Sequence, residues 1–75
     1  MNLKLYFQYP NRSGGVNREL VCSFEDKNQS VALALQDLKR RCPEYKSYYQ
    51  RTWKEDGEMW IDFGSWSEFY IVVED

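Results

Sequence analysis

The sequence contains no histidine, the side chain that most often moves protons or binds zinc near neutral pH. Its absence excludes Ser-His catalytic triads and zinc sites that need an imidazole ligand. Cysteine is scarce as well, because Cys22 and Cys42 are the only two and are too few for a disulfide-stapled scaffold. We therefore expect two buried free thiols and a cytoplasmic protein. A single disulfide between the two cysteines is the alternative.

Long apolar runs are missing too. No segment approaches the roughly 18 consecutive apolar residues of a membrane span, and no apolar stretch of the kind found in signal peptides follows the first five residues. We therefore expect no association with a membrane. No repeat, low-complexity tract or linker interrupts the 75 residues, which predicts a single domain over residues 1–75.

Alternating apolar and polar residues predict a β-hairpin at the start of the chain. Residues 3–9 alternate in this way, and residues 19–24 do so again. The second alternation places Leu20 on the same face as Cys22 and Phe24, which we expect to be the buried face. A turn-forming segment with two glycines separates the two strands.

A helix is expected to follow the hairpin. Asp26 is a suitable capping residue at its start, and the proline at position 43 ends it. The basic residues 39–41 fall in its last turn, where they meet the negative end of the helix dipole. Leu33 points away from the stripe that we expect to be buried. That stripe consists of Val31, Ala34, Leu35, Leu38 and Cys42.

Three further strands are expected after the helix. Residues 47–54 favour β-structure but alternate poorly, which indicates either an edge strand or a β-bulge. The pair Asp56-Gly57 predicts a tight turn before an alternating run at 59–63, and a second turn precedes the run at 69–73. The order ββαβββ predicts an α+β fold, a two-layer sandwich with one helix packed on a mainly antiparallel sheet.

Strand periodicity also assigns side chains to the two faces of this sheet. Ile61, together with Phe69, Ile71 and Val73, is expected to face the helix. The opposite face then carries acidic and aromatic residues, with Val72 among them, and it stays open because one helix covers only one face. An alternative is that these large side chains only shield the sheet from solvent. The predicted partner-binding residues of this face and the adjacent turn are Glu58, Trp60, Asp62, Trp66, Glu68, Tyr70 and Glu74.

No combination of residues predicts catalysis. Glu55, Asp56 and Glu58 lie together at an exposed turn, where nothing separates their pKa values as acid–base catalysis requires. A run that resembles a calcium loop begins at Asp26, but it has Val31 where such a loop needs glycine. We therefore expect a protein that is not an enzyme, with no catalytic residue, metal site or cofactor.

Charge is distributed unevenly along the chain. Residues 1–43 carry seven Lys or Arg and four Asp or Glu, whereas residues 44–75 carry three and eight. Carboxylates in the acidic part would steer a basic protein partner towards the aromatic residues. In general character, being short, acidic and rich in aromatics, the chain resembles small phage-encoded inhibitor proteins, anti-CRISPR proteins among them. The resemblance assigns no residue, and it implies binding rather than catalysis.

The sequence thus predicts a protein-binding module, an inhibitor that presents its acidic aromatic sheet face to a basic surface of a nucleic-acid-handling protein. Two alternatives stay open. In one, Arg12, Arg18 and residues 39–41 bind nucleic acid directly. In the other, the uncovered sheet pairs with a second copy of the chain in a homodimer.

Overall fold

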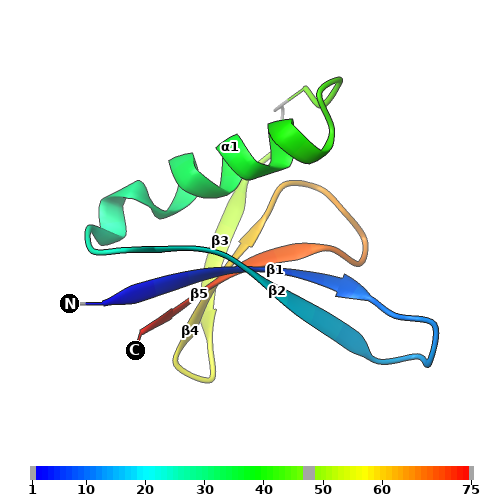
Figure 1. Cartoon of the computed structure of the whole chain (residues 1–75), viewed down its shortest axis with the longest axis horizontal. Helices are drawn as coiled ribbons and strands as arrows, with labels where there is room; N and C mark the ends of the chain where they lie inside the picture. Colours follow the sequence, from blue (N-terminus) through cyan, green and yellow to red (C-terminus); the bar gives the residue numbers. More distant parts are fainter. Residues whose placement is uncertain (1, 47–48, 75) are drawn as a thin grey trace.

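The computed structural model describes residues 2–46 and 49–74, and within them it contains one five-stranded antiparallel sheet and one α-helix (Figure 1). The strand order in the sheet is β2-β1-β5-β4-β3. The predicted α+β fold and the order ββαβββ are therefore confirmed. The elements are β1 (Leu3–Pro10), β2 (Val16–Phe24), a 3₁₀ turn η1 (Lys27–Gln29), α1 (Ser30–Arg41), β3 (Arg51–Glu55), β4 (Glu58–Asp62) and β5 (Phe69–Glu74).

Strand β3 lies at an edge of the sheet, as predicted for residues 47–54; positions 47 and 48 of that prediction lie outside the described residues. The turn that follows β3 has the predicted form. Asp56 and Gly57 have φ values of 53° and 77°, which is the backbone of a two-residue hairpin turn. The residues on either side of the turn pair directly, so this turn sets the register of β3 against β4.

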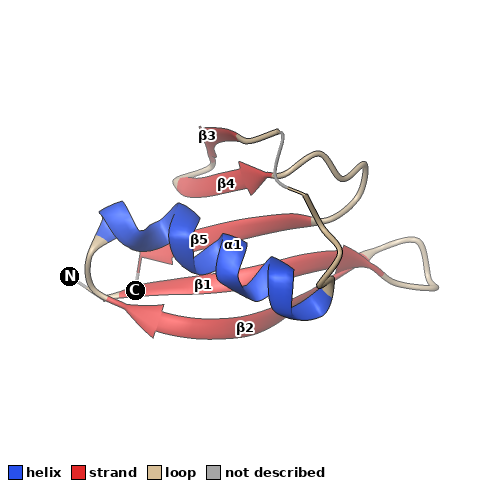
Figure 2. Ribbon diagram, turned by 90° about the horizontal axis from the view of Figure 1, so that it is seen from above, coloured by secondary structure: helices blue, strands red, loops and turns tan. Residues whose placement is uncertain are grey.

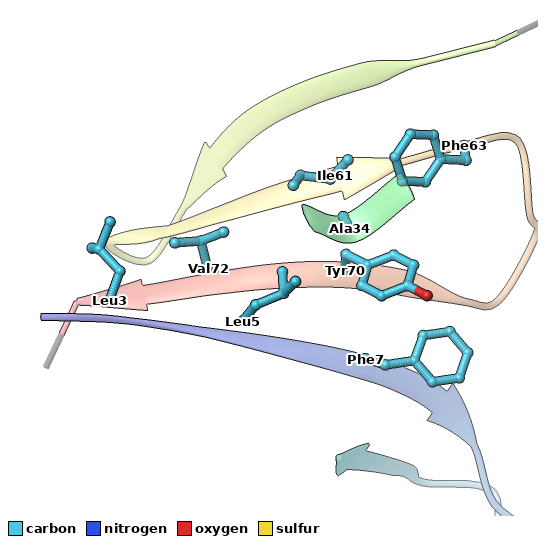
Figure 3. Packing of buried hydrophobic residues seen from close by; sticks show 8 residues of the cluster. All are labelled: Leu3, Leu5, Phe7, Ala34, Ile61, Phe63, Tyr70 and Val72. Atoms are coloured by element: carbon cyan, nitrogen blue, oxygen red, sulfur yellow. The ribbon is translucent and has the colours of Figure 1, made fainter. Parts of the chain in front are cut away.

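The helix covers one face of the sheet. In Figure 2, α1 crosses β5, β1 and β2, while β4 and β3 extend beyond it. Ala34 of the helix and Leu5 and Ile61 of the sheet have no exposed surface, and Figure 3 shows them on the same side of the sheet. The hydrophobic core consists of Leu3, Leu5, Phe7, Ala34, Ile61, Phe63, Tyr70 and Val72.

The helix begins one turn later than Asp26 alone suggests. The Asp26 carboxylate accepts a hydrogen bond of 3.0 Å from the backbone N–H of Asn28, and this bond caps the 3₁₀ turn rather than the α-helix itself. Ser30 then starts α1, and its hydroxyl donates to the backbone carbonyl of Lys27 at 2.7 Å. Within the described ranges, no helix has the length and apolar character needed to cross a membrane.

The buried stripe of α1 differs from the predicted one. Ser30, Ala34 and Asp37 are buried along successive turns, whereas Leu35 is only partly buried. Leu33, which we expected to point away, packs against the core. Ala34 and the partly buried Val31, Leu35 and Leu38 pack against the core as predicted, so the prediction was wrong only about Leu33 and Cys42 and in leaving out Ser30 and Asp37. The contact is centred on small and hydrogen-bonded side chains, and the leucines flank it.

A β-bulge in β2 reverses the predicted direction of Leu20. The register between β1 and β2 shifts, so that Cys22 pairs with Leu5 while Leu20 pairs with Tyr6, and Val21 is the extra residue. The Leu20 side chain therefore lies on the sheet face away from the helix, where it is 52% exposed. Periodicity missed this because one extra residue moves every side chain beyond it to the other face.

Strand β5 also presents the opposite face from the predicted one. Tyr70 and Val72 belong to the core, and they pair with core residues of β1. Phe69, Ile71 and Val73 therefore lie on the face away from the helix, contrary to the prediction. The prediction failed because this strand is apolar along most of its length, so that its sequence contains no alternation that distinguishes the two faces.

The two cysteines are free thiols, as predicted, but they differ in exposure. Cys22 is partly buried on the helix side of β2. Cys42, which we expected to be buried, is exposed at the end of α1, where its backbone N–H donates to the carbonyl of Leu38 at 2.8 Å. The helix ends there in a non-helical conformation, which removes Cys42 from the buried stripe.

Candidate functional site

A pocket of about 680 Å³ opens at one end of the sheet, on the side that carries the helix. Its walls come from α1, the connection after the helix, the loop between β4 and β5, and the strands β1 and β5. Figure 3 shows three of its rings, Phe7, Tyr70 and Phe63, gathered at this end of the core. The aromatic residues that line it are Phe7, Tyr45, Tyr49, Phe63, Trp66 and Tyr70.

Neighbouring rings of the pocket stand at steep angles to one another. The ring centroids of Phe7 and Tyr70 are 5.1 Å apart, with the planes inclined by 41°. Phe63 meets Tyr70 at 6.0 Å and 75°, and Tyr45 meets Phe63 at 6.4 Å and 73°. Inclined arrangements of this kind are favourable for aromatic pairs.

Hydrogen bonds fix the segments that form these walls. The hydroxyl of Tyr45 donates to the carbonyl oxygen of Phe63 at 2.7 Å, which ties the connection after α1 to the end of β4. Gly64 follows with a φ of 100°, a conformation that favours glycine, and its N–H donates to the Asp62 carboxylate at 2.8 Å. The ring of Tyr49 lies against this glycine. The pocket is thus preformed.

Trp66 lies at the rim of the pocket with 99% of its surface exposed. The loop that carries it is ordered by the Ser65 hydroxyl, which accepts the backbone N–H groups of Ser67 and Glu68 at 3.4 and 3.1 Å. Burying a large apolar side chain contributes roughly 3 kcal/mol. An ordered loop therefore holds a large apolar ring in solvent, where its burial would be favourable.

The pocket is acidic as well as aromatic. Two carboxylates, those of Asp62 and Glu68, line it, and its described lining includes no lysine or arginine. Asp62 is buried, with Arg51 at 4.0 Å. Glu68 is exposed, and its carboxylate forms no ion pair with any residue that the structure describes. Glu68 therefore supplies the unpaired negative charge of the site.

A buried charge network supports the floor of the pocket. The Tyr70 hydroxyl donates to the Asp37 carboxylate at 2.7 Å, and Arg41 and Arg40 donate to the same carboxylate at 2.5 and 2.8 Å. Burial alone would raise the pKa of Asp37, but these hydrogen bonds outweigh it and hold the pKa below its ordinary value. Burial and the Asp37 charge raise the pKa of Tyr70, so its hydroxyl stays a donor.

Arg41, which is not among the residues that line the pocket, also contacts one of its rings. Its guanidinium carbon lies 4.2 Å from the centroid of the Phe7 ring, and the same group donates to Glu19 of β2. The two carboxylates that Arg41 contacts, Asp37 and Glu19, balance its charge. A cation therefore already lies on one ring of the pocket, in the geometry of a cation–π contact.

The sheet face away from the helix is covered by its own side chains. Trp60 stacks on Trp53 with centroids 5.9 Å apart and meets Phe69 edge-on at 5.4 Å. Ile71 has no exposed surface beneath them, and the buried indole N–H of Trp60 has no hydrogen-bond partner among the described residues. These contacts favour the alternative that large side chains shield the sheet. One row of cross-strand neighbours on this face is Leu20, Tyr6, Ile71, Trp60 and Trp53.

Glu58 of this face is already paired. Arg18 donates two hydrogen bonds to its carboxylate, at 2.8 and 3.0 Å, and a third to the side chain of Gln8 at 2.9 Å. The bond from Arg18 is the main cause that lowers the pKa of Glu58. The two charges neutralise each other, so this carboxylate adds little to the attraction of a basic partner.

The pocket brings together four of the predicted partner-binding residues, namely Asp62, Trp66, Glu68 and Tyr70. We predicted that these residues share the sheet face away from the helix or the adjacent turn. They meet instead at the pocket, because Tyr70 faces the helix and is only 2% exposed. Its placement on the open face was wrong. Tyr70 forms the floor of the pocket, and the other three residues stand around it.

The other three predicted residues lie elsewhere. Glu58 and Trp60 belong to the face away from the helix, as predicted. Glu74 lies at the far end of β5 on the same face as Tyr70 and pairs with the core residue Leu3, so its placement on the opposite face was wrong. Sequence reasoning missed the wall residues Tyr45 and Tyr49, which precede β3. The aromatic density of that segment was the only sequence signal for them.

Among the residues that the structure describes, no three His, Cys, Asp or Glu side chains gather in a way that would hold a metal ion.

Comparison of the chain with protein families, with curated proteins and with solved structures gives no match.

Proposed function

We propose that the protein is a non-enzymatic binding module, an inhibitor that attaches to a basic surface of a nucleic-acid-handling protein. Its attachment site is the end of the sheet where the pocket opens. The observation that carries the proposal is that fully exposed Trp66, an aromatic hollow and a Glu68 carboxylate without an ion pair among the described residues occur at one place. Tryptophan is a frequent anchor of interfaces, and carboxylates speed the approach of a basic partner.

A basic partner fits the charge of the segments that build the site. Residues 44–75 supply most of the pocket, and they carry three Lys or Arg against eight Asp or Glu. A surface that binds nucleic acid is positively charged because it neutralises phosphates. Carboxylates that dock on such a surface take the place of phosphates, and this competition is the basis for proposing inhibition.

Direct nucleic-acid binding has less support. Three guanidinium groups that would contact phosphates, those of Arg18, Arg40 and Arg41, donate to carboxylates of the chain itself. Arg12 and Lys39 are exposed. Of this basic set, they are the two cations without a carboxylate partner among the described residues, and two such cations on an acidic protein provide a weak electrostatic basis for binding a polyanion.

Capture from a lysate of the native host, compared between variants, tests the proposal. We expect a nucleic-acid-handling protein to be retained by the natural chain and by Arg12→Ala, and lost with Trp66→Ala. Added DNA should compete with this capture. Labelled single- and double-stranded DNA and RNA at low salt should show no mobility shift with the protein alone. A shift that disappears in Arg12→Ala, with capture unaffected by Trp66→Ala, would instead support direct nucleic-acid binding.

Self-association is the second candidate function, and one observation favours it. β2 is an edge strand of nine residues that exposes Val16 and Leu20 at 55% and 52%. An exposed edge of this length offers unpaired backbone groups to a second copy, although the bulge at Val21 interrupts it. Light scattering after size exclusion distinguishes a dimer of 9.1 kDa chains from a monomer. If a dimer forms, Leu20→Arg should dissociate it.

A further inference from the structure

We propose that the pocket recognises the guanidinium group of an arginine side chain presented by the partner. This inference deepens the proposed function and rests on it, because it names the chemistry that the aromatic and acidic site receives. Three features support it: the inclined rings, the unpaired carboxylate at the rim and the size of the hollow.

The rings supply the attraction for a cation. The face of an aromatic ring carries negative charge density, so several rings around one space attract a positive group more strongly than an uncharged group of equal size. Phe63 and Tyr70 stand at 75° to each other, and Tyr45 at 73° to Phe63. These edge-to-face contacts form the inner part of the lining, and the exposed rings of Tyr49 and Trp66 line the same pocket with surface that an entering group can contact.

The carboxylates add a charge that the surroundings do not cancel. Asp62 has Arg51 at 4.0 Å, whereas Glu68 at the rim forms no ion pair with a described residue. Arg41, behind the Phe7 ring, is balanced by two carboxylates of its own. Glu68 is therefore the carboxylate that we expect to accept hydrogen bonds from the guanidinium.

Arginine fits this site better than lysine. A guanidinium is planar and weakly hydrated, so it stacks on rings while it donates two parallel hydrogen bonds to a carboxylate, whereas an ammonium is compact and strongly hydrated. The chain twice uses this contact itself, with Arg41 at 4.2 Å from the Phe7 centroid and Arg51 at 4.6 Å from that of Trp53. A hollow of about 680 Å³ also admits the alkyl stem and the adjoining backbone.

Titration with short peptides tests the inference on the whole chain. The probes are acetyl-Ala-Arg-Ala-amide and the same peptide with citrulline, which keeps the shape of arginine but has no charge. A lysine peptide is the third probe. In ¹H–¹⁵N spectra, the arginine peptide should shift the indole N–H of Trp66 and the backbone N–H groups of Gly64 and Glu68. Its affinity should exceed that of the citrulline peptide by about fivefold or more and also exceed that of the lysine peptide.

A matched pair of charge-removing variants locates the interaction. Glu68→Gln should reduce the affinity for the arginine peptide about fivefold and leave that for the citrulline peptide unchanged. Glu25→Gln removes the same charge from an exposed position before α1 and should leave both affinities unchanged. Equal affinity for the arginine and citrulline peptides, or equal effects of the two variants, would overturn the inference.

The failure of this inference is distinguishable from the failure of the proposed function. If Trp66→Ala abolishes capture of a protein partner but the arginine peptide binds no better than citrulline, the binding module stands and arginine recognition is wrong. If the peptide binds at the pocket as expected but capture does not depend on Trp66, arginine recognition stands and the proposed docking surface is wrong.

Discussion

The hydroxyl of Tyr70 donates a 2.7 Å hydrogen bond to the buried carboxylate of Asp37, and this contact joins the central strand β5 to the helix. The contact favours the observed face of β5 towards α1. If β5 presented its other face to the helix, the Tyr70 hydroxyl would lie on the far side of the sheet and could not reach Asp37. Asp37 would then be buried with one donor fewer, which is costly for a carboxylate whose side chain is 4% exposed. The same contact makes Tyr70 the floor of the pocket.

Replacing Tyr70 by phenylalanine keeps the ring and removes this hydrogen bond. We expect Tyr70→Phe to lower the free energy of unfolding by about 1–3 kcal/mol, because Asp37 loses a donor in a buried place. Chemical denaturation measures the loss. Tyr49→Phe is the matched control, since its ring is 45% exposed and the change should cost less than about 0.5 kcal/mol. Equal losses in the two variants would show that the Tyr70 bond contributes no stability.

The lowered pKa of Asp37 predicts how the free energy of unfolding depends on pH. Its pKa in the folded protein lies below the ordinary value of 3.8, so its contribution is complete above about pH 4 and is lost as the pH falls through the folded pKa. Asp37→Asn should be less stable at pH 7 by about 3 kcal/mol, because Arg40 and Arg41 lose their partner.

Urea midpoints measured between pH 3 and pH 7 check both parts of this prediction. The difference between the natural chain and Asp37→Asn should narrow towards pH 3. Glu58 titrates in the same direction because Arg18 lowers its pKa, so some acid dependence persists in the variant. A constant difference across the range would contradict the assigned role of Asp37.

Local sequence signals predicted most of the fold. The Asp56-Gly57 pair specified its own turn, and the proline at position 43 lies two residues beyond the helix end. These features depend on residues close together in the chain, which is why the order ββαβββ was predictable. The predicted side-chain directions of Leu20 and Ile71 were wrong because local periodicity does not determine them. Leu20 adjoins a β-bulge, and Ile71 lies in a strand that is apolar along most of its length.

The site was predicted only in part for the same reason. Trp66 was predicted from the turn that carries it, whereas Glu68 was assigned by strand parity to the open face and lies instead in the loop before β5. The pocket itself depends on Tyr45 and Phe63, which are 18 residues apart and meet through one hydrogen bond. No periodicity records such a contact between loops. The buried position of Asp37 was equally invisible, because a carboxylate on a helix is usually solvated.

The tight approach of α1 to the sheet predicts that the same substitution is costly at one alanine of the helix and nearly neutral at another. Ala34 has no exposed surface, whereas Ala32 is exposed. Ala34→Leu should lower the free energy of unfolding by about 1–3 kcal/mol, because the longer side chain must push the helix away from the sheet. Ala32→Leu should change it by less than about 0.5 kcal/mol, since both residues favour helices equally well. Denaturant midpoints decide, and a reversed ranking would mean that the helix presents another face.

The two thiols should differ in reactivity because their surroundings differ. Burial and the nearby charge of Asp37 raise the pKa of Cys22, which lowers the fraction of reactive thiolate, whereas Cys42 is exposed. At pH 8 we expect a thiol reagent to modify Cys42 about tenfold faster than Cys22 in the folded protein.

In urea the modification rates of the two cysteines should become similar. Cys42→Ser should remove the fast phase and Cys22→Ser the slow one, which assigns each phase to its residue. Equal rates in the folded state would contradict the difference in burial, and an intact mass lower by two hydrogens would reveal a disulfide instead of two free thiols.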